Sequence, residues 1–84
     1  MLKRVYELSR DDRVACYLAD WVTFDREAGI HLRRSRGQRR YGRPSRYWLR
    51  VPGWDRDKGF TACTDDEAIA KANALLAKEE TADA

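Results

Sequence analysis

The sequence predicts an α+β domain in which a small, twisted antiparallel β-sheet of three or more strands packs against one C-terminal α-helix. Three observations lead to this prediction. Residues 65–78 follow a helix-capping sequence and repeat apolar side chains at helical spacing. Residues 46–51 alternate apolar and polar side chains, as a strand with one buried face does. Turn residues separate further short apolar runs, which predicts hairpins.

The length of 84 residues predicts a single domain over residues 1–80, a size that argues against elaborate chemistry. Apolar residues make up 43% of the chain, which is ordinary for a globular protein. Residues 35–45 are too rich in arginine, glycine and proline to bury apolar surface, so we expect a flexible loop there. We expect the polar residues 81–84 to fray.

The N-terminal part of the chain is the least clear. Residues 2–8 could add an edge strand to the sheet. Residues 10–20 have apolar side chains at helical spacing, and Ser9 with Asp12 could cap a helix, but the same residues also fit an interrupted strand. A short helix is favoured, and the strand stays open as the alternative.

Two hairpins are expected. The first joins residues 21–24 to residues 30–34 across a polar turn. The second joins residues 46–51 to residues 60–63, across a turn in which Pro52 and Gly53 end the first strand and Asp57, Lys58 and Gly59 supply turn residues. Strand alternation places Arg46, Trp48 and Arg50 on one face of the second hairpin and apolar side chains on the other.

The C-terminal helix has a clear start. Thr64 and Glu67 form a capping box, in which each side chain satisfies a backbone N–H of the first turn. The acidic residues of that turn suit the positive end of the helix dipole. The narrow apolar stripe of this helix is typical of one that lies on a sheet. Its members are Ala68, Ile69, Ala72, Leu75 and Leu76.

Positive charge is segregated in one stretch. Residues 30–51 contain eight arginines and no acidic residue, and the rest of the chain has nine basic against 14 acidic residues. These arginines are Arg33, Arg34, Arg36, Arg39, Arg40, Arg43, Arg46 and Arg50. Such an asymmetry indicates a polyanionic partner, most often a nucleic acid. Together with Tyr41 and Trp48, these arginines form the predicted nucleic-acid-binding site.

The residue types support this interpretation. Arginine accounts for 13 of the 17 basic residues, and its planar guanidinium makes paired hydrogen bonds to phosphate or to the major-groove edge of guanine. Tyr41 and Trp48 suit stacking on bases or sugars.

Other functional classes find little support. His31 is the only histidine and lies among basic residues, so we expect no catalytic triad and no enzyme. Cys16 and Cys63 lack companions at metal-ligand spacing, so we expect no metal site, no cofactor and reduced thiols. We expect neither a signal peptide nor a membrane span, and hence a cytoplasmic protein without a membrane partner.

The segment YWLRVPGWDRDKGFTACTDDEAIAKANALLAK extends this interpretation. Over about residues 30–78 the chain resembles the small DNA-binding domains of plant AP2 type and the N-terminal arm-binding domain of phage tyrosine integrases. In these families a K-x-F-x-T-x-x-E-A passage links the last strand to the helix. Lys58, Phe60, Thr64, Glu67 and Ala68 approximate that passage, with two additional residues between Phe60 and Thr64. The resemblance implies a three-stranded sheet laid in the major groove, with Arg33, Arg46, Trp48 and Arg50 on its outer face.

The sequence therefore predicts a non-catalytic nucleic-acid-binding module, regulatory or accessory to a phage or mobile element, with duplex DNA favoured and RNA also open. The alternative is a small phage-type inhibitor or adaptor that uses the same arginines to bind an acidic protein surface, for example of a nuclease or defence complex. Neither prediction determines the oligomeric state.

Overall fold

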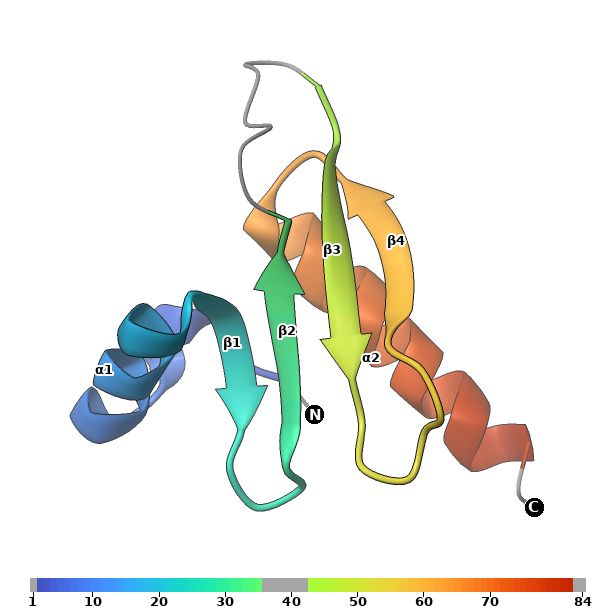
Figure 1. The fold of residues 1–84 in the computed structure, drawn as a ribbon, viewed down its shortest axis with the longest axis horizontal. Helices are drawn as coiled ribbons and strands as arrows, with labels where there is room; N and C mark the ends of the chain where they lie inside the picture. Colours follow the sequence, from blue (N-terminus) through green and yellow to red (C-terminus); the bar gives the residue numbers. More distant parts are fainter. Residues whose placement is uncertain (1, 36–42, 83–84) are drawn as a thin grey trace.

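The computed structural model describes residues 2–35 and 43–82 and confirms the α+β class. Four strands form one antiparallel sheet in the order β1-β2-β3-β4. The elements are a 3₁₀ turn η1 (Val5–Glu7), α1 (Arg10–Ala19), β1 (Trp21–Asp25), β2 (Ile30–Arg34), β3 (Ser45–Arg50), β4 (Lys58–Ala62) and α2 (Asp65–Ala82). Figure 1 shows α2 crossing one face of the sheet and α1 lying beside β1.

Helix α1 is confirmed, and the strand alternative for this segment is wrong. The Ser9 side chain accepts a hydrogen bond from the Asp12 backbone N–H at 3.2 Å, as an N-cap should. The helix ends at Asp20, whose φ of 62° is left-handed, and β1 begins at the next residue. The helix packs Cys16, which is 1% exposed, against the body of the protein.

The predicted edge strand over residues 2–8 is wrong. This segment forms η1 and is bound to α2 instead. The Leu2 backbone N–H donates to Asn73 Oδ1 at 2.8 Å, and Asn73 Nδ2 donates to the Leu2 carbonyl at 3.0 Å. One amide side chain thus satisfies both backbone groups that a strand partner would otherwise have taken.

The core lies between the sheet and α2. Leu32 and Leu49, which are opposite each other on β2 and β3, are fully buried, and so are Ala68 and Ala72 of the helix. The alanines let the helix backbone approach the sheet closely, and Tyr47 fills the end of this layer near the start of α2.

Helix α2 begins with the predicted capping box. Thr64 Oγ1 accepts from the Glu67 backbone N–H at 3.1 Å, and Glu67 Oε2 accepts from the Cys63 N–H at 3.2 Å, one residue before the expected donor. The hydrogen bond from Cys63 and then Lys71 lower the pKa of Glu67. The helix continues to Ala82, past the predicted end at Lys78. Over the described residues, neither helix combines the length and apolarity needed to cross a bilayer.

Candidate nucleic-acid interface

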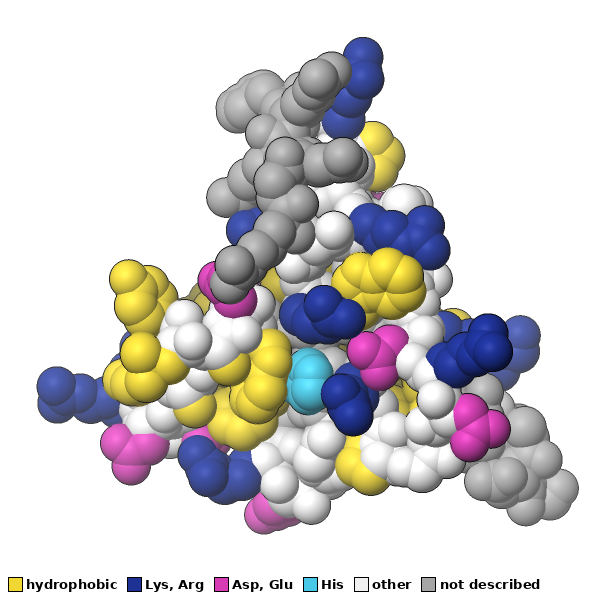
Figure 2. Space-filling view, in the orientation of Figure 1, with side chains coloured by type: hydrophobic (Ala, Val, Ile, Leu, Met, Phe, Trp, Pro, Cys, Tyr) yellow, Lys and Arg dark blue, Asp and Glu magenta, His cyan; other side chains and the backbone are white. Residues whose placement is uncertain are grey.

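The strand register gathers six side chains on the face of the sheet that α2 leaves uncovered. Arg33 of β2 lies opposite Trp48 of β3, and His31 lies opposite Arg50. We call this surface the open face, and its members are Trp21, His31, Arg33, Arg46, Trp48 and Arg50. Figure 2 views it directly, with basic and apolar side chains around the single histidine. The predicted cationic face of residues 46–51 is therefore present.

Trp48 is the centre of the basic half of this face. The guanidinium carbon of Arg46 lies 4.8 Å from the centroid of the indole ring, and that of Arg33 lies 5.8 Å from it. Both distances are within the range of cation–π attraction. An arginine positioned by an aromatic ring retains N–H donors for an incoming phosphate or base. Two strands thus supply an Arg–Trp–Arg group.

Gly59 makes this arrangement sterically possible. It lies opposite Trp48 in the β3–β4 ladder. A Cβ atom on Gly59 would be 2.8 Å from Trp48 Cζ3 and 3.0 Å from Arg46 Nη2, both too close. The sequence predicted Gly59 as a turn residue, yet it belongs to β4. A glycine within a strand is the sequence signal for such a close approach, and it was missed because the strand was predicted to begin only at Phe60.

Asp57 is another residue that the sequence analysis did not assign to the site, as are Trp21 and His31. Its carboxylate lies 3.4 Å from Arg33 Nη2 and 4.0 Å from Arg50 Nε. These half-exposed pairs contribute little to stability, but they orient two arginines of the open face. Among the described residues no carboxylate lies within 4.0 Å of the Arg46 guanidinium, so the positive potential is least compensated there.

An aromatic group borders the basic half. The Trp21 and His31 rings stack with centroids 4.5 Å apart and planes 14° apart, and Phe24 adjoins Trp21 at 5.2 Å. Burial lowers the pKa of His31, and the nearby charges of Arg50 and Arg33 lower it as well, while Asp57 opposes them. His31 is therefore mainly neutral at pH 7, and the positive charge of the open face comes from its arginines.

Two predicted site residues, Arg34 and Arg43, are not members of the open face. Arg34 belongs to the α2 side of the sheet, where its Nη1 lies 3.4 Å from Asp65 Oδ1. Tyr47 donates its hydroxyl hydrogen to the same oxygen at 2.7 Å, and burial together with this bond raises the pKa of Tyr47 to about 12. Arg34 thus joins the start of α2 and not the open face. Arg43 is exposed just before β3.

The remaining predicted residues, Arg36, Arg39, Arg40 and Tyr41, lie outside the described residues, as does most of the predicted loop over residues 35–45. Ser45, at the end of that loop, is the first residue of β3.

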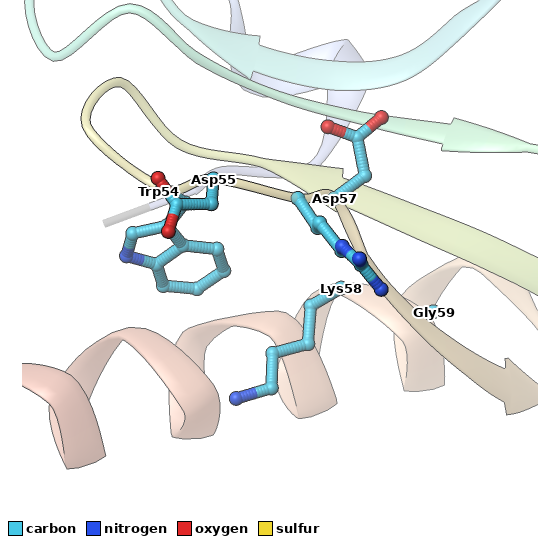
Figure 3. Close-up of a pocket in the computed structure, with 6 residues that line it drawn as sticks. Trp54, Asp55, Asp57, Lys58 and Gly59 are labelled. Carbon is cyan, nitrogen blue, oxygen red and sulfur yellow. The ribbon is translucent and has the colours of Figure 1, made fainter.

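A shallow hollow of about 400 Å³ lies beside the β3–β4 turn, along residues 54–59. Figure 3 shows Trp54 and Lys58 directed toward α2, whereas Asp57 points to the other side of the hairpin. The Lys58 ammonium lies 5.7 Å from the Trp54 ring centroid. The hollow is lined by both acidic and basic side chains. In residues 2–35 and 43–82 no group of three histidine, cysteine or acidic residues lies close enough together to hold a metal ion.

No family model, curated protein or solved structure matches this chain. The functional interpretation therefore depends on the chemistry of the open face.

Proposed function

We propose that this protein is a non-catalytic module that binds nucleic acid, preferably duplex DNA, through the open face. The observation that carries the proposal is the Arg33–Trp48–Arg46 group on the side of the sheet opposite α2. Arginines next to an aromatic ring combine phosphate binding with contacts to bases or sugars. Arg50 extends the same surface along β3.

The charge distribution supports an anionic ligand. The open face holds three arginines, and Asp57 is the acidic residue within ion-pair distance of two of them. Because that carboxylate would repel a phosphate, we expect phosphates to bind first on the Arg46 side.

The shape of the surface favours the major groove. Neighbouring strands are about 4.8 Å apart, so β2, β3 and β4 span about 10 Å between their outer axes. The major groove of B-DNA is about 12 Å wide. An arginine directed from the sheet could there form a bidentate contact with guanine, in agreement with the resemblance to sheet-based DNA-binding domains.

The test is fluorescence anisotropy with a labelled 20-base-pair DNA duplex (a length of about two turns), the corresponding RNA duplex and single strands, at low and moderate salt. We expect Arg46→Ala with Arg50→Ala to weaken duplex DNA binding by about tenfold or more. The log–log salt slope should fall by about 0.9 for each phosphate that the variant no longer neutralises.

The matched control is Arg10→Ala with Arg13→Ala, which removes the same charge from exposed positions of α1. Equal loss of affinity in both double variants would show that net charge alone determines binding and would overturn the assignment to the open face. No binding to any nucleic acid at low salt would overturn the proposed function. A pull-down from nuclease-treated lysate would then test an acidic protein partner.

A further inference from the structure

Asp57 is an acidic residue within the basic half of the open face. It lies just before β4, two residues ahead of Gly59, so strand alternation turns both residues to the same side of the sheet. Leu49 pairs with Lys58, and continuing that register places Asp57 beside Arg50. Figure 3 shows the Asp57 carboxylate directed away from α2. In Figure 2, acidic surface lies among the basic side chains next to the histidine.

The two oxygens of this carboxylate meet arginines from two strands. Oδ2 lies 3.4 Å from Arg33 Nη2 of β2, and Oδ1 lies 4.0 Å from Arg50 Nε of β3. The Asp57 side chain is 26% exposed, against 48% for Arg33 and 67% for Arg50, so the carboxylate is less accessible than the arginines that it joins. A phosphate that bridged the same two guanidinium groups would have to displace this carboxylate or bind against its negative charge.

A ligand can break these ion pairs. Water screens the charges of half-exposed side chains, so the pairs contribute little to stability. Because Asp57 belongs to the same chain, however, its effective concentration at the two arginines is about millimolar or higher. The tethered carboxylate therefore competes with a dilute phosphate without closing the site.

Other carboxylates near the sheet make contacts that stabilise the fold. Asp65 accepts the Tyr47 hydroxyl hydrogen at 2.7 Å, and Glu67 accepts the Cys63 backbone N–H at 3.2 Å. Both contacts hold the start of α2. Asp57 instead pairs with guanidinium groups of the open face, so its effect should fall on binding more than on folding.

We propose that Asp57 is a specificity-determining residue, which competes with phosphate for Arg33 and Arg50 and so limits the charge-driven binding of nucleic acids of any sequence. This inference rests on the proposed function, because nucleic acid is the ligand whose binding it regulates. Phosphate contacts supply affinity without sequence information, whereas contacts to base edges supply specificity. A carboxylate among the arginines weakens the first kind of contact more than the second, because base edges are neutral.

The test compares Asp57→Asn with Asp55→Asn by fluorescence anisotropy, on DNA duplexes of unrelated sequence over a range of salt. Asparagine keeps the shape and turn-forming tendency of aspartate and removes its charge. Asp55 is exposed in the same β3–β4 connection, so its substitution is the matched control for net charge. We expect Asp57→Asn to strengthen binding about fivefold or more at low salt, and the log–log salt slope to steepen by about 0.9 for each phosphate gained. Asp55→Asn should change affinity by less than about twofold.

The gain in affinity should depend on the two arginines. In a background of Arg33→Gln with Arg50→Gln, Asp57→Asn should no longer strengthen binding. A gain that persists there, or an equal gain in Asp55→Asn, would overturn the proposal, because the carboxylate would then act only through net charge. Unchanged or weaker binding by Asp57→Asn would also contradict it, since the carboxylate would not compete with phosphate. Thermal melts check that each variant is folded.

A second measurement separates this inference from the proposed function. Inorganic pyrophosphate is titrated into the full chain without nucleic acid, while NMR follows the Nε–H signals of Arg33 and Arg50. We expect Asp57→Asn to bind pyrophosphate at least about threefold more tightly than the wild type does. Equal affinities would rule out the competition, even if the wild type binds DNA. A wild type that binds no nucleic acid, together with the expected pyrophosphate difference, would overturn the proposed function and leave the competition by Asp57 supported.

Discussion

The two faces of the sheet differ completely, although consecutive residues of the same strands supply them. On the α2 side Leu32 and Leu49 are fully buried, while their neighbours Arg33 and Arg50 on the open side are exposed. The alternation of strand side chains thus separates the core from the proposed binding surface at intervals of one residue. Substitutions on one face should change the free energy of unfolding, and substitutions on the other should change affinity.

The largest expected effect is on the buried face. Leu49→Ala should lower the free energy of unfolding by about 2–5 kcal/mol, because it removes a fully buried side chain and leaves a cavity. Its neighbour Arg50→Ala should change stability by less than about 0.5 kcal/mol. Urea denaturation measures both. Similar destabilisation by the two substitutions would contradict the separation of the faces.

The second effect concerns the packing beneath Trp48. Gly59→Ala should weaken DNA binding about tenfold, or about 1.4 kcal/mol, because the new methyl group displaces the Trp48 ring and the Arg46 guanidinium. The affected atoms are the ends of side chains, so the fold should persist, as a thermal melt would show. In a Trp48→Ala background the same substitution should cost clearly less affinity. Equal effects in both backgrounds would mean that Gly59 acts independently of Trp48.

The third effect tests the helix start, which lies on the α2 side. Thr64→Ala should cost about 1 kcal/mol of stability, because it removes the acceptor of the Glu67 N–H hydrogen bond. Affinity of the folded protein for DNA should not change. Thr64→Ser is the matched control, since it changes the same residue but keeps the hydroxyl acceptor of the cap. Thermal melts and binding titrations on the same samples decide the outcome.

The smallest effect is a pH dependence from His31 at the border of the open face. Its pKa is lower in the folded state than in the unfolded state, so the unfolded chain binds more protons below about pH 6.5. Stability should therefore fall as the pH decreases from 6.5 toward the folded-state pKa. His31→Gln should reduce this slope in urea titrations between pH 7.5 and 5.5. An unchanged slope would mean that groups other than His31 cause the pH dependence of stability.

Patterns within short segments were sufficient to predict much of the fold. Strand alternation predicted which side chains of β3 face the helix, and the capping box predicted the start of α2 within one residue. The limits of β1, β2, β3 and β4 differ from the predicted limits by at most two residues. These features depend on local hydrogen bonding and side-chain periodicity, which neighbouring residues specify.

Contacts between distant residues could not be predicted in this way. Asp57 reaches Arg33 across 24 positions, and Asn73 binds Leu2 across 71. Arg34 follows the strand alternation onto the α2 side, where Asp65 pairs with it. Such partners depend on the strand register and on how the helices pack against the sheet. Alternation within a strand gives the side on which a charged residue lies, but the group that it meets there is set when the whole chain has folded.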